Sequence, residues 1–227
     1  MEINNYFINI MKDILIIVPI RKGSQRVKNK NLRAFADTTL LEIKLRTLKQ
    51  INNVDIMVNT DCEQAINIAK SYDVLIHKRE DYYASSECTN SEFFEHIAQN
   101  VPKEYKYVMY CPVTSPLVSI KTINEVINLF LKNPEESVNT TTLIKHHLWL
   151  NGKPLNYNPS KSPNSQDLPD IMSINYAVNI LKRETMIERK NVLSKNPKFI
   201  VLEQYESVDI DTMFDFQISE FLYKLQR

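Results

Sequence analysis

Five basic residues and a glycine lie in one loop that directly follows a short apolar run. The basic residues are Arg21, Lys22, Arg26, Lys28 and Lys30, and no acidic residue falls between positions 19 and 31. Gly23 is one of only two glycines in the chain. Glycine lets backbone N–H groups approach an anion, and Arg and Lys neutralise its charge, so the loop suits a triphosphate. A solvated basic loop is the alternative. A P-loop is excluded, because Gly-x-x-x-x-Gly-Lys-Ser/Thr is absent.

Two carboxylates near the C-terminus form the second candidate feature. Asp209 and Asp211 are separated by one residue, and the pattern over 207–210 predicts a strand. Residues i and i+2 of a strand point to the same face, and two adjacent like charges are costly without a cation between them. Their hard oxygen ligands suit Mg²⁺. Alternatively, Asp211 caps the last helix and Asp209 is solvated.

Taken together, the basic loop and the carboxylates indicate nucleotidyl transfer. The loop would hold a triphosphate, and Mg²⁺ would neutralise the charge that develops as pyrophosphate leaves. This chemistry requires both features to meet at one edge of the fold.

The elements that must position these residues alternate between β-branched runs and helical patterns, which is typical of an α/β layered domain. We predict strands over 14–18, 54–59, 74–77, 107–111, 137–144, 172–181, 199–204 and 207–210. We predict helices over 40–48, 65–69, 93–101, 120–131 and 211–225. Ligands of such folds bind at the carboxyl ends of the strands, where the basic loop begins.

Residues 146–170 break this alternation with Pro154, Pro159, Pro163 and Pro169. The stretch is too proline-rich for a core element and too long for an idle loop. We interpret it as an arm inserted within a single domain that spans 1–227.

Composition limits the other possibilities. The net charge of +1 excludes a strongly basic nucleic-acid binder. No apolar run is long enough for a membrane span, and the run after Asp13 is too short for a signal peptide. The three cysteines form no CxxC pair and suit free thiols in a reducing compartment. We therefore expect a cytoplasmic protein with no nucleic-acid or membrane partner, and a loose extension over 1–11.

Several motifs, in order and spacing, resemble the CMP-N-acylneuraminate (sialic acid and nonulosonic acid) cytidylyltransferase family. The first loop matches its Pro-x-Arg-x-Gly-Ser-Lys/Gln-x-x-x-x-Lys-Asn signature at Pro19, Arg21, Gly23, Ser24, Gln25, Lys30 and Asn31. Further matches are Thr60-Asp61, the Arg79–Ser85 segment, Thr114-Ser115-Pro116-Leu117 and Asp209-Ile210-Asp211. The resemblance covers nearly the whole chain from about Ile14.

The resemblance implies a three-layer, Rossmann-like nucleotidyltransferase fold with a mostly parallel sheet and an inserted dimerisation arm. It implies transfer of CMP from CTP to an acidic sugar, a nonulosonate or another 2-keto-3-deoxy acid, for cell-surface glycan biosynthesis. The arm would make a homodimer and reach into the partner's site.

The resemblance also implies residue roles. The CTP-binding residues would be Arg21, Gly23, Ser24, Gln25, Lys30, Asn31, Arg79, Cys88 and Asn90, with Arg79 near the base and Cys88 and Asn90 near the ribose. Thr114, Ser115 and Asn175 would contact the acceptor. Asp209 and Asp211 would hold Mg²⁺ and, with Arg21 and Lys30, form the catalytic set.

Departures from the family pattern fall on the acceptor side. Pro112 replaces a glutamine, Tyr176 replaces a glycine, and Ser165 stands where a basic residue is usual. The acceptor could therefore be another nonulosonate, a different 2-keto-3-deoxy acid or a phosphonate.

Two other functions remain open. A nucleotidyltransferase for a phosphorylated acceptor would share the fold, but its usual Gly-x-Gly-Thr-Arg loop is absent. A non-catalytic nucleotide-binding homologue would be expected to lack the Asp pair or the basic loop, and both are present.

Overall fold

The computed structural model describes residues 10–24 and 26–226. A seven-stranded sheet runs through the molecule in the order β3-β2-β1-β4-β8-β5-β9. The strands are β1 (Ile14–Ile20), β2 (Asp55–Thr60), β3 (Leu75–Lys78), β4 (Tyr107–Tyr110), β5 (Val138–Ile144), β8 (Ile171–Lys182) and β9 (Lys198–Val201). β8 runs antiparallel to its neighbours β4 and β5, and every other neighbouring pair in this sheet is parallel. The predicted mostly parallel sheet is confirmed.

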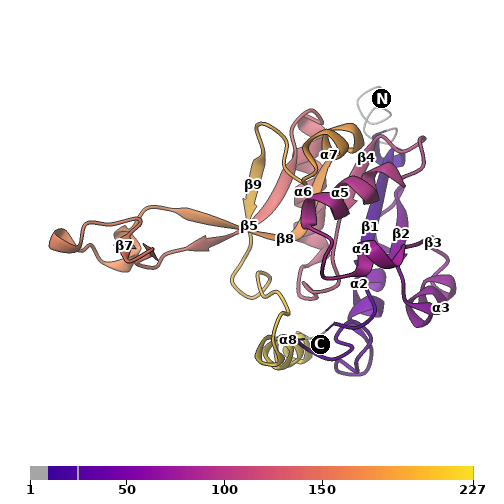
Figure 1. The fold of residues 1–227 in the computed structure, drawn as a ribbon, viewed down its shortest axis with the longest axis horizontal. Coiled ribbons are helices and arrows are strands. Elements are labelled where there is room, and N and C mark those ends of the chain that lie inside the picture. The colour runs from indigo at the N-terminus through magenta and orange to yellow at the C-terminus, as the bar shows by residue number, and fades with distance from the viewer. Residues whose placement is uncertain (1–9, 25, 227) are drawn as a thin grey trace.

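Helices cover both faces of the sheet (Figure 1). They are α2 (Leu40–Leu48), α3 (Glu63–Ser71), α4 (Asp81–Ala84), α5 (Asn90–Gln99), α6 (Ile120–Lys132), α7 (Arg183–Arg189) and α8 (Met213–Leu225). Successive side chains of a strand point to opposite faces, so the wholly buried β1 contributes to two cores. Ile14, Ile16 and Val18 pack with α2 and α6, whereas Leu15 and Ile17 pack with α5 and α7. These three layers confirm the predicted fold class.

The predicted strand over 207–210 is wrong. These residues form a loop between β9 and α8, where Ile210 N–H donates to the Thr114 carbonyl at 2.9 Å. The alternating Val-Asp-Ile-Asp pattern resembles a half-buried strand, but the sheet ends at β9 and offers this segment no neighbouring strand. The following helix begins at Met213 with Thr212 as its cap, and the short helices α4 and α7 were not predicted.

The start of the chain also differs from expectation. Ile10 is buried within the core and Met11 packs against it, so these two residues are not part of a loose extension. The rest of that predicted extension, residues 1–9, lies outside the described residues.

Residues 146–170 form an arm that stands clear of the body (Figure 1). It leaves from the ends of β5 and β8, whose last paired residues are Ile144 and Ile171. A small hairpin of β6 (Trp149–Leu150) and β7 (Lys153–Pro154) turns through Asn151-Gly152, both in the left-handed conformation. Asn-Gly is the preferred sequence for such a two-residue turn.

None of the helices in residues 10–24 and 26–226 combines the length and apolar character needed to span a bilayer.

Candidate active site

A cavity of about 430 Å³ opens at the carboxyl ends of β1 and β4. The loops that follow these strands, together with α4 and the start of α5, supply its walls. The structure brings eight of the predicted site residues together in its lining: Arg21, Ser24, Lys30, Asn31, Arg79, Cys88, Asn90 and Thr114.

Hydrogen bonds within and behind the basic loop hold its shape. Gly23 adopts φ +75°, a conformation that favours glycine, and no heavy atom lies within 4 Å of a Cβ built there. The Asp61 carboxylate accepts from the backbone N–H of Lys22 at 2.8 Å, which explains the aspartate of the Thr60-Asp61 motif at the end of β2. The Ser24 hydroxyl donates to the Val27 carbonyl and accepts from Lys30 N–H, so it is used in fixing the loop.

The guanidinium of Arg21 lies at the C-terminal end of α4. Its Nη1 is 3.3 Å from the carbonyl oxygens of Ala84 and Ser85, the last residue and the cap of that helix. Helix carbonyls carry partial negative charge, so they hold this cation at the cavity while its side chain remains exposed. Arg21 therefore lies where an anionic ligand can reach it.

Lys30 connects the basic loop to the two carboxylates. Its ammonium donates to the Ile210 carbonyl and lies 3.6 Å from Asp211 Oδ1. Arg26, from the same loop, forms a salt bridge with Asp211 at 2.8 Å. The two features that were predicted to act together are thus in direct contact.

Burial and neighbouring charge shift the pKa values of this cluster. Burial raises the pKa of Asp209, and the nearby Asp211 raises it further, while a hydrogen bond from Thr114 opposes both. Burial lowers the pKa of Lys30 and outweighs the attraction of both carboxylates. In both residues burial disfavours the charged form. A bound cation would stabilise the charged Asp209, and a bound polyphosphate would stabilise the charged Lys30.

The carboxylates fit a magnesium ion, although not by the predicted strand geometry. Asp209 Oδ1 is buried and has no hydrogen-bond partner among the described residues, and Asp211 lies beside it with a half-exposed side chain. No group of three or more His, Cys, Asp or Glu forms a metal cluster in residues 10–24 and 26–226. Mg²⁺ is commonly bound by one or two carboxylates, with substrate phosphates and water completing the shell.

Arg79 forms a separate wall of the cavity. Its side chain is almost fully buried, and its guanidinium stacks 4.5 Å above the ring of Phe93. Burial lowers its pKa to about 10, so the group stays charged at neutral pH. The aromatic residues Tyr83, Phe93 and Tyr110 also line this wall, and they were not predicted. Phe93 falls at the start of the predicted helix over 93–101, which gave it no site role.

Asp209 and Asp211 are not part of this lining, although Asp211 contacts Lys30, which is. Other predicted residues also lie outside it. Gly23 lines a second cavity that shares Arg21 and Asn31 with the first. Ser115 is buried, and its carbonyl accepts from the ammonium of Lys44 at 2.9 Å. The Asn175 side chain is bonded within the sheet, accepting from Thr140 and donating to Thr142. Gln25 lies outside the described residues.

Lys44 shows what sequence reasoning missed. It is fully buried on α2, and its ammonium meets the loop after β4 that carries Thr114. Its signal in the sequence was a lysine on the same helical face as Leu40, Leu41 and Leu48, where an apolar residue would be usual.

The three departures from the family pattern have different positions. Pro112 lines the cavity, and Ser165 lies in the arm, at the start of a 3₁₀ turn (Ser165–Asp167). Tyr176 adopts φ +57°, a left-handed conformation that favours the glycine it replaces. Its ring stacks on Phe94 with 6.1 Å between centroids.

Known proteins resemble this chain over nearly its full length. The CMP-N,N'-diacetyllegionaminic acid synthase of Campylobacter jejuni is 26% identical over 95% of this chain and 97% of its own. A pseudaminic acid cytidylyltransferase of C. jejuni is 25% identical, covering 93% and 96%.

Solved structures show the same fold at low identity. A CMP:2-keto-3-deoxy-manno-octonic acid synthetase complexed with CTP aligns with a TM-score of 0.69 and 10% identity over 94% of this chain and 99% of its own.

The model of the family described as Cytidylyltransferase matches residues 15–221. That match includes the basic loop, the Arg79 wall and both carboxylates, and so the chain belongs to the cytidylyltransferase family, enzymes that transfer a cytidylyl group from CTP.

Proposed function

We propose that this enzyme transfers CMP from CTP to a hydroxyl group of an acidic sugar, a nonulosonate or another 2-keto-3-deoxy acid, and releases pyrophosphate. The contact of Lys30 with Ile210 and Asp211 carries the proposal, because Lys30 lines the cavity with the other cations of the basic loop and joins them to the carboxylate pair beside it. The names of the relatives, which act on legionaminic, pseudaminic and octulosonic acids, support the acceptor class.

The chain's own residues supply the binding and orientation. Arg21, Arg26 and Lys30 surround the position of the triphosphate, and Arg79 contacts the nucleoside. The acceptor hydroxyl oxygen forms a bond to the α-phosphorus, and the bond between the α-phosphorus and the oxygen that bridges to the β-phosphate breaks. Pyrophosphate leaves with that oxygen, and the hydroxyl proton passes to solvent water. Cations fixed before the reaction stabilise the charge that grows on the leaving pyrophosphate.

Asp209 and Asp211 would hold Mg²⁺. The ion would neutralise phosphate charge and help to orient the α-phosphate. The unpartnered Asp209 oxygen supports this assignment.

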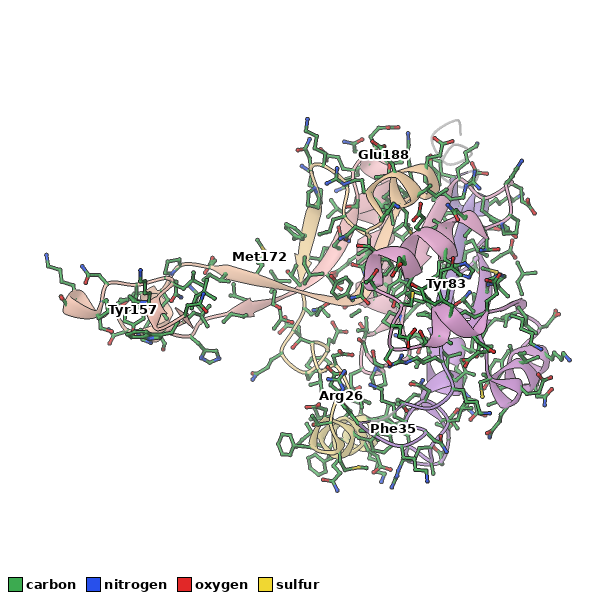
Figure 2. The ribbon with its side chains drawn as sticks, viewed as in Figure 1. Arg26, Phe35, Tyr83, Tyr157, Met172 and Glu188 are labelled. Carbon is green, nitrogen blue, oxygen red and sulfur yellow. The ribbon has the colours of Figure 1, made fainter. Side chains whose placement is uncertain are left out.

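We further propose that the enzyme is a homodimer joined through the arm of residues 146–170. Trp149, Leu150 and Leu155 are each more than half exposed there, which is unusual for large apolar residues on an isolated hairpin. Figure 2 shows Tyr157 within the arm and Met172 at its base, away from the body of the molecule. Cytoplasmic location is supported by the free thiols of Cys62, Cys88 and Cys111.

The test is pyrophosphate release with each of the four nucleoside triphosphates and Mg²⁺, against a panel of nonulosonic acids, other 2-keto-3-deoxy sugars and small phosphonates. Of the four nucleoside triphosphates, we expect only CTP to support turnover, and we expect the acceptor to be an acidic sugar. Turnover only with a phosphonate would overturn the acceptor assignment. Absence of CTP binding by calorimetry would overturn the proposal as a whole.

A further inference from the structure

Arg79 is held from behind by the side chain and backbone of Asn59. Arg79 Nε donates to Asn59 Oδ1 at 2.6 Å, and Nη2 donates to the Asn59 carbonyl at 2.7 Å. Phe93 covers one face of the guanidinium. The direction in which the remaining N–H groups face the cavity therefore depends on how Asn59 is fixed.

Asn59 is in turn fixed by His77. The two residues are opposite each other in the parallel pair of β2 and β3, and Asn59 Nδ2 lies 2.6 Å from His77 Nδ1. Because Asn59 Oδ1 accepts from Arg79, its NH₂ group must face His77. His77 Nδ1 must then be the acceptor, which places the proton of the neutral ring on Nε2.

Groups from α5 and its C-terminal end lie against the His77 ring, and α4 packs behind them. Asn100, just after α5, is a hydrogen-bond partner of His77, and His96 on α5 has its ring centroid 5.6 Å away. Tyr83 on α4 stacks on His96 at 3.5 Å and lines the cavity; it is labelled in Figure 2. The charged residues that act on His77 are Arg79 and Glu80, both next to its own strand.

We propose that neutral His77 is a positioning residue that, through Asn59, orients Arg79 for nucleotide binding, and that protonation of His77 weakens this binding. The proposal rests on CTP being the substrate. It assigns a pH-sensitive function to three side chains, two of which do not line the cavity.

The donors and acceptors of His77, Asn59 and Arg79 explain why protonation of His77 would disturb Arg79. A protonated His77 would direct an N–H from Nδ1 at the Asn59 NH₂ group. Turning the Asn59 amide around would satisfy His77, but it would direct the NH₂ group at Arg79 Nε. The amide of asparagine has only one oxygen, and both Arg79 and a protonated His77 would need it as an acceptor. Neither orientation of Asn59 therefore satisfies both residues once His77 is protonated.

The sign of the pH effect follows from the environment. Burial and the Arg79 charge lower the pKa of His77 from its ordinary value, while Asn100 and Glu80 oppose them. The neutral, binding-competent form therefore predominates at neutral pH. It is lost as the pH falls through the lowered pKa, and bound nucleotide should lower that pKa further by linkage.

The test compares His77→Phe with His77→Gln. Glutamine can accept from Asn59 and donate to Asn100 at any pH, whereas phenylalanine can do neither. By calorimetry near neutral pH, His77→Phe should weaken CTP binding on the order of tenfold, as expected when the support of a charged hydrogen-bonding group is lost. His77→Gln should bind like the wild type there. Circular dichroism would establish that both variants fold.

Acidification separates a positioning function from a structural one. As the pH is lowered through the pKa of His77, the wild type should lose more affinity for CTP than His77→Gln does, since titration of the CTP phosphates affects both proteins equally. Asn59→Asp should also reduce this extra loss, because a carboxylate can accept from Arg79 and from protonated His77 together. Equal affinity of His77→Phe and wild type near neutral pH, or parallel acid losses in wild type and His77→Gln, would overturn the proposal.

Nuclear magnetic resonance distinguishes failure of this proposal from failure of the proposed substrate. In the protein without nucleotide, the Arg79 Nε–H should exchange slowly in the wild type and in His77→Gln, and faster in His77→Phe. Equal exchange in all three proteins would overturn the linkage even if CTP binds. Slow exchange in an enzyme that binds no CTP would preserve the linkage of the three side chains but overturn its function in nucleotide binding.

Discussion

At the scale of single residues, the site depends on charges held close together before any ligand binds. Lys30 and Asp209 are both substantially buried. The pKa of Lys30 is lowered and that of Asp209 is raised, which is the reverse of what a simple ion pair produces. Burial is the first cause in each case. Folding has already removed water from these charged groups. A ligand of opposite charge is therefore favoured, because its binding compensates for the hydration that they have lost.

Asp211→Ala should reduce turnover by about a thousandfold or more, because it removes an expected Mg²⁺ ligand and leaves Arg26 and Lys30 without their partner. The fold should persist, since the Asp211 side chain is 45% exposed. Steady-state pyrophosphate release and a thermal melt measure the two effects. Glu125→Ala is the control, because Glu125 pairs with Lys121 on the exposed side of α6. Turnover close to that of the control would contradict the assignment of Asp211.

Arg21→Ala should raise the KM for CTP and lower kcat, reducing kcat/KM by about a hundredfold or more, since the charge that Arg21 meets grows in the transition state. Arg21→Lys should recover only part of this loss, because an ammonium cannot reproduce a bidentate fork. Initial-rate kinetics against CTP concentration test it. The control is Arg46→Ala, whose guanidinium bonds to Tyr72 away from the cavity. If kcat and KM both stayed unchanged in Arg21→Ala, the residue would not contact the phosphates.

At the scale of elements, the positions of loops matter more than the bounds of strands. The basic loop is shaped by Asp61 from the end of β2, and the 203–212 segment is tied to the loop after β4 through Ile210. Among their described residues, neither loop forms a helix or a strand of the main sheet. The ends of β1, β2 and β4 therefore determine where the cations and carboxylates meet.

Tyr176 tests the cost of a side chain in the left-handed conformation of β8. Both Tyr176→Gly and Tyr176→Ala lose the ring that packs on Phe94, but only alanine keeps the strained Cβ. Alanine should therefore be less stable than glycine by about 1 kcal/mol, the left-handed cost less the greater unfolded-state entropy of glycine. Urea unfolding would measure the difference, with Tyr176→Phe as the variant that keeps the ring. An alanine variant at least as stable as the glycine variant would show that no strain is held at this position.

At the scale of the whole molecule, the arm of residues 146–170 extends away from the body (Figure 1). Lys145 and Asp170 form a salt bridge at its base, next to the last paired residues of β5 and β8. Beyond this point Trp149, Leu150 and Leu155 are each more than half exposed in a single copy of the chain. A second copy would cover them.

Replacing residues 146–169 by Asn-Gly should join Lys145 to Asp170 through a two-residue turn and leave the body folded. The shortened protein should be a monomer, whereas the full chain should be a dimer. Light scattering after gel filtration would measure the mass, and circular dichroism the fold. Trp149→Asp together with Leu150→Asp should have the same effect, while Lys161→Ala should not. A full chain that is monomeric, or a shortened chain that remains dimeric, would contradict the arm as the interface.

The sequence by itself determined the layered α/β fold, the basic loop and the arm. The unbroken apolar run of β1, the helical periodicity of α2, the cations around Gly23 and the cluster of prolines are local patterns. Such patterns depend on neighbours along the chain. The motif order also determined the family. For these features no long-range contact had to be known.

Only the tertiary structure decided which side chains meet. Asp209 and Asp211 were expected to converge on a strand, yet they lie in a loop. That loop contacts Lys30 through Ile210, which is 180 positions away along the chain. Lys44, Asn59 and His77 were not recognised, because each acts through a partner brought near by strand order or helix packing. Burial, hydrogen-bond direction and pKa depend on those partners, and the spacing of residues in a sequence does not contain them.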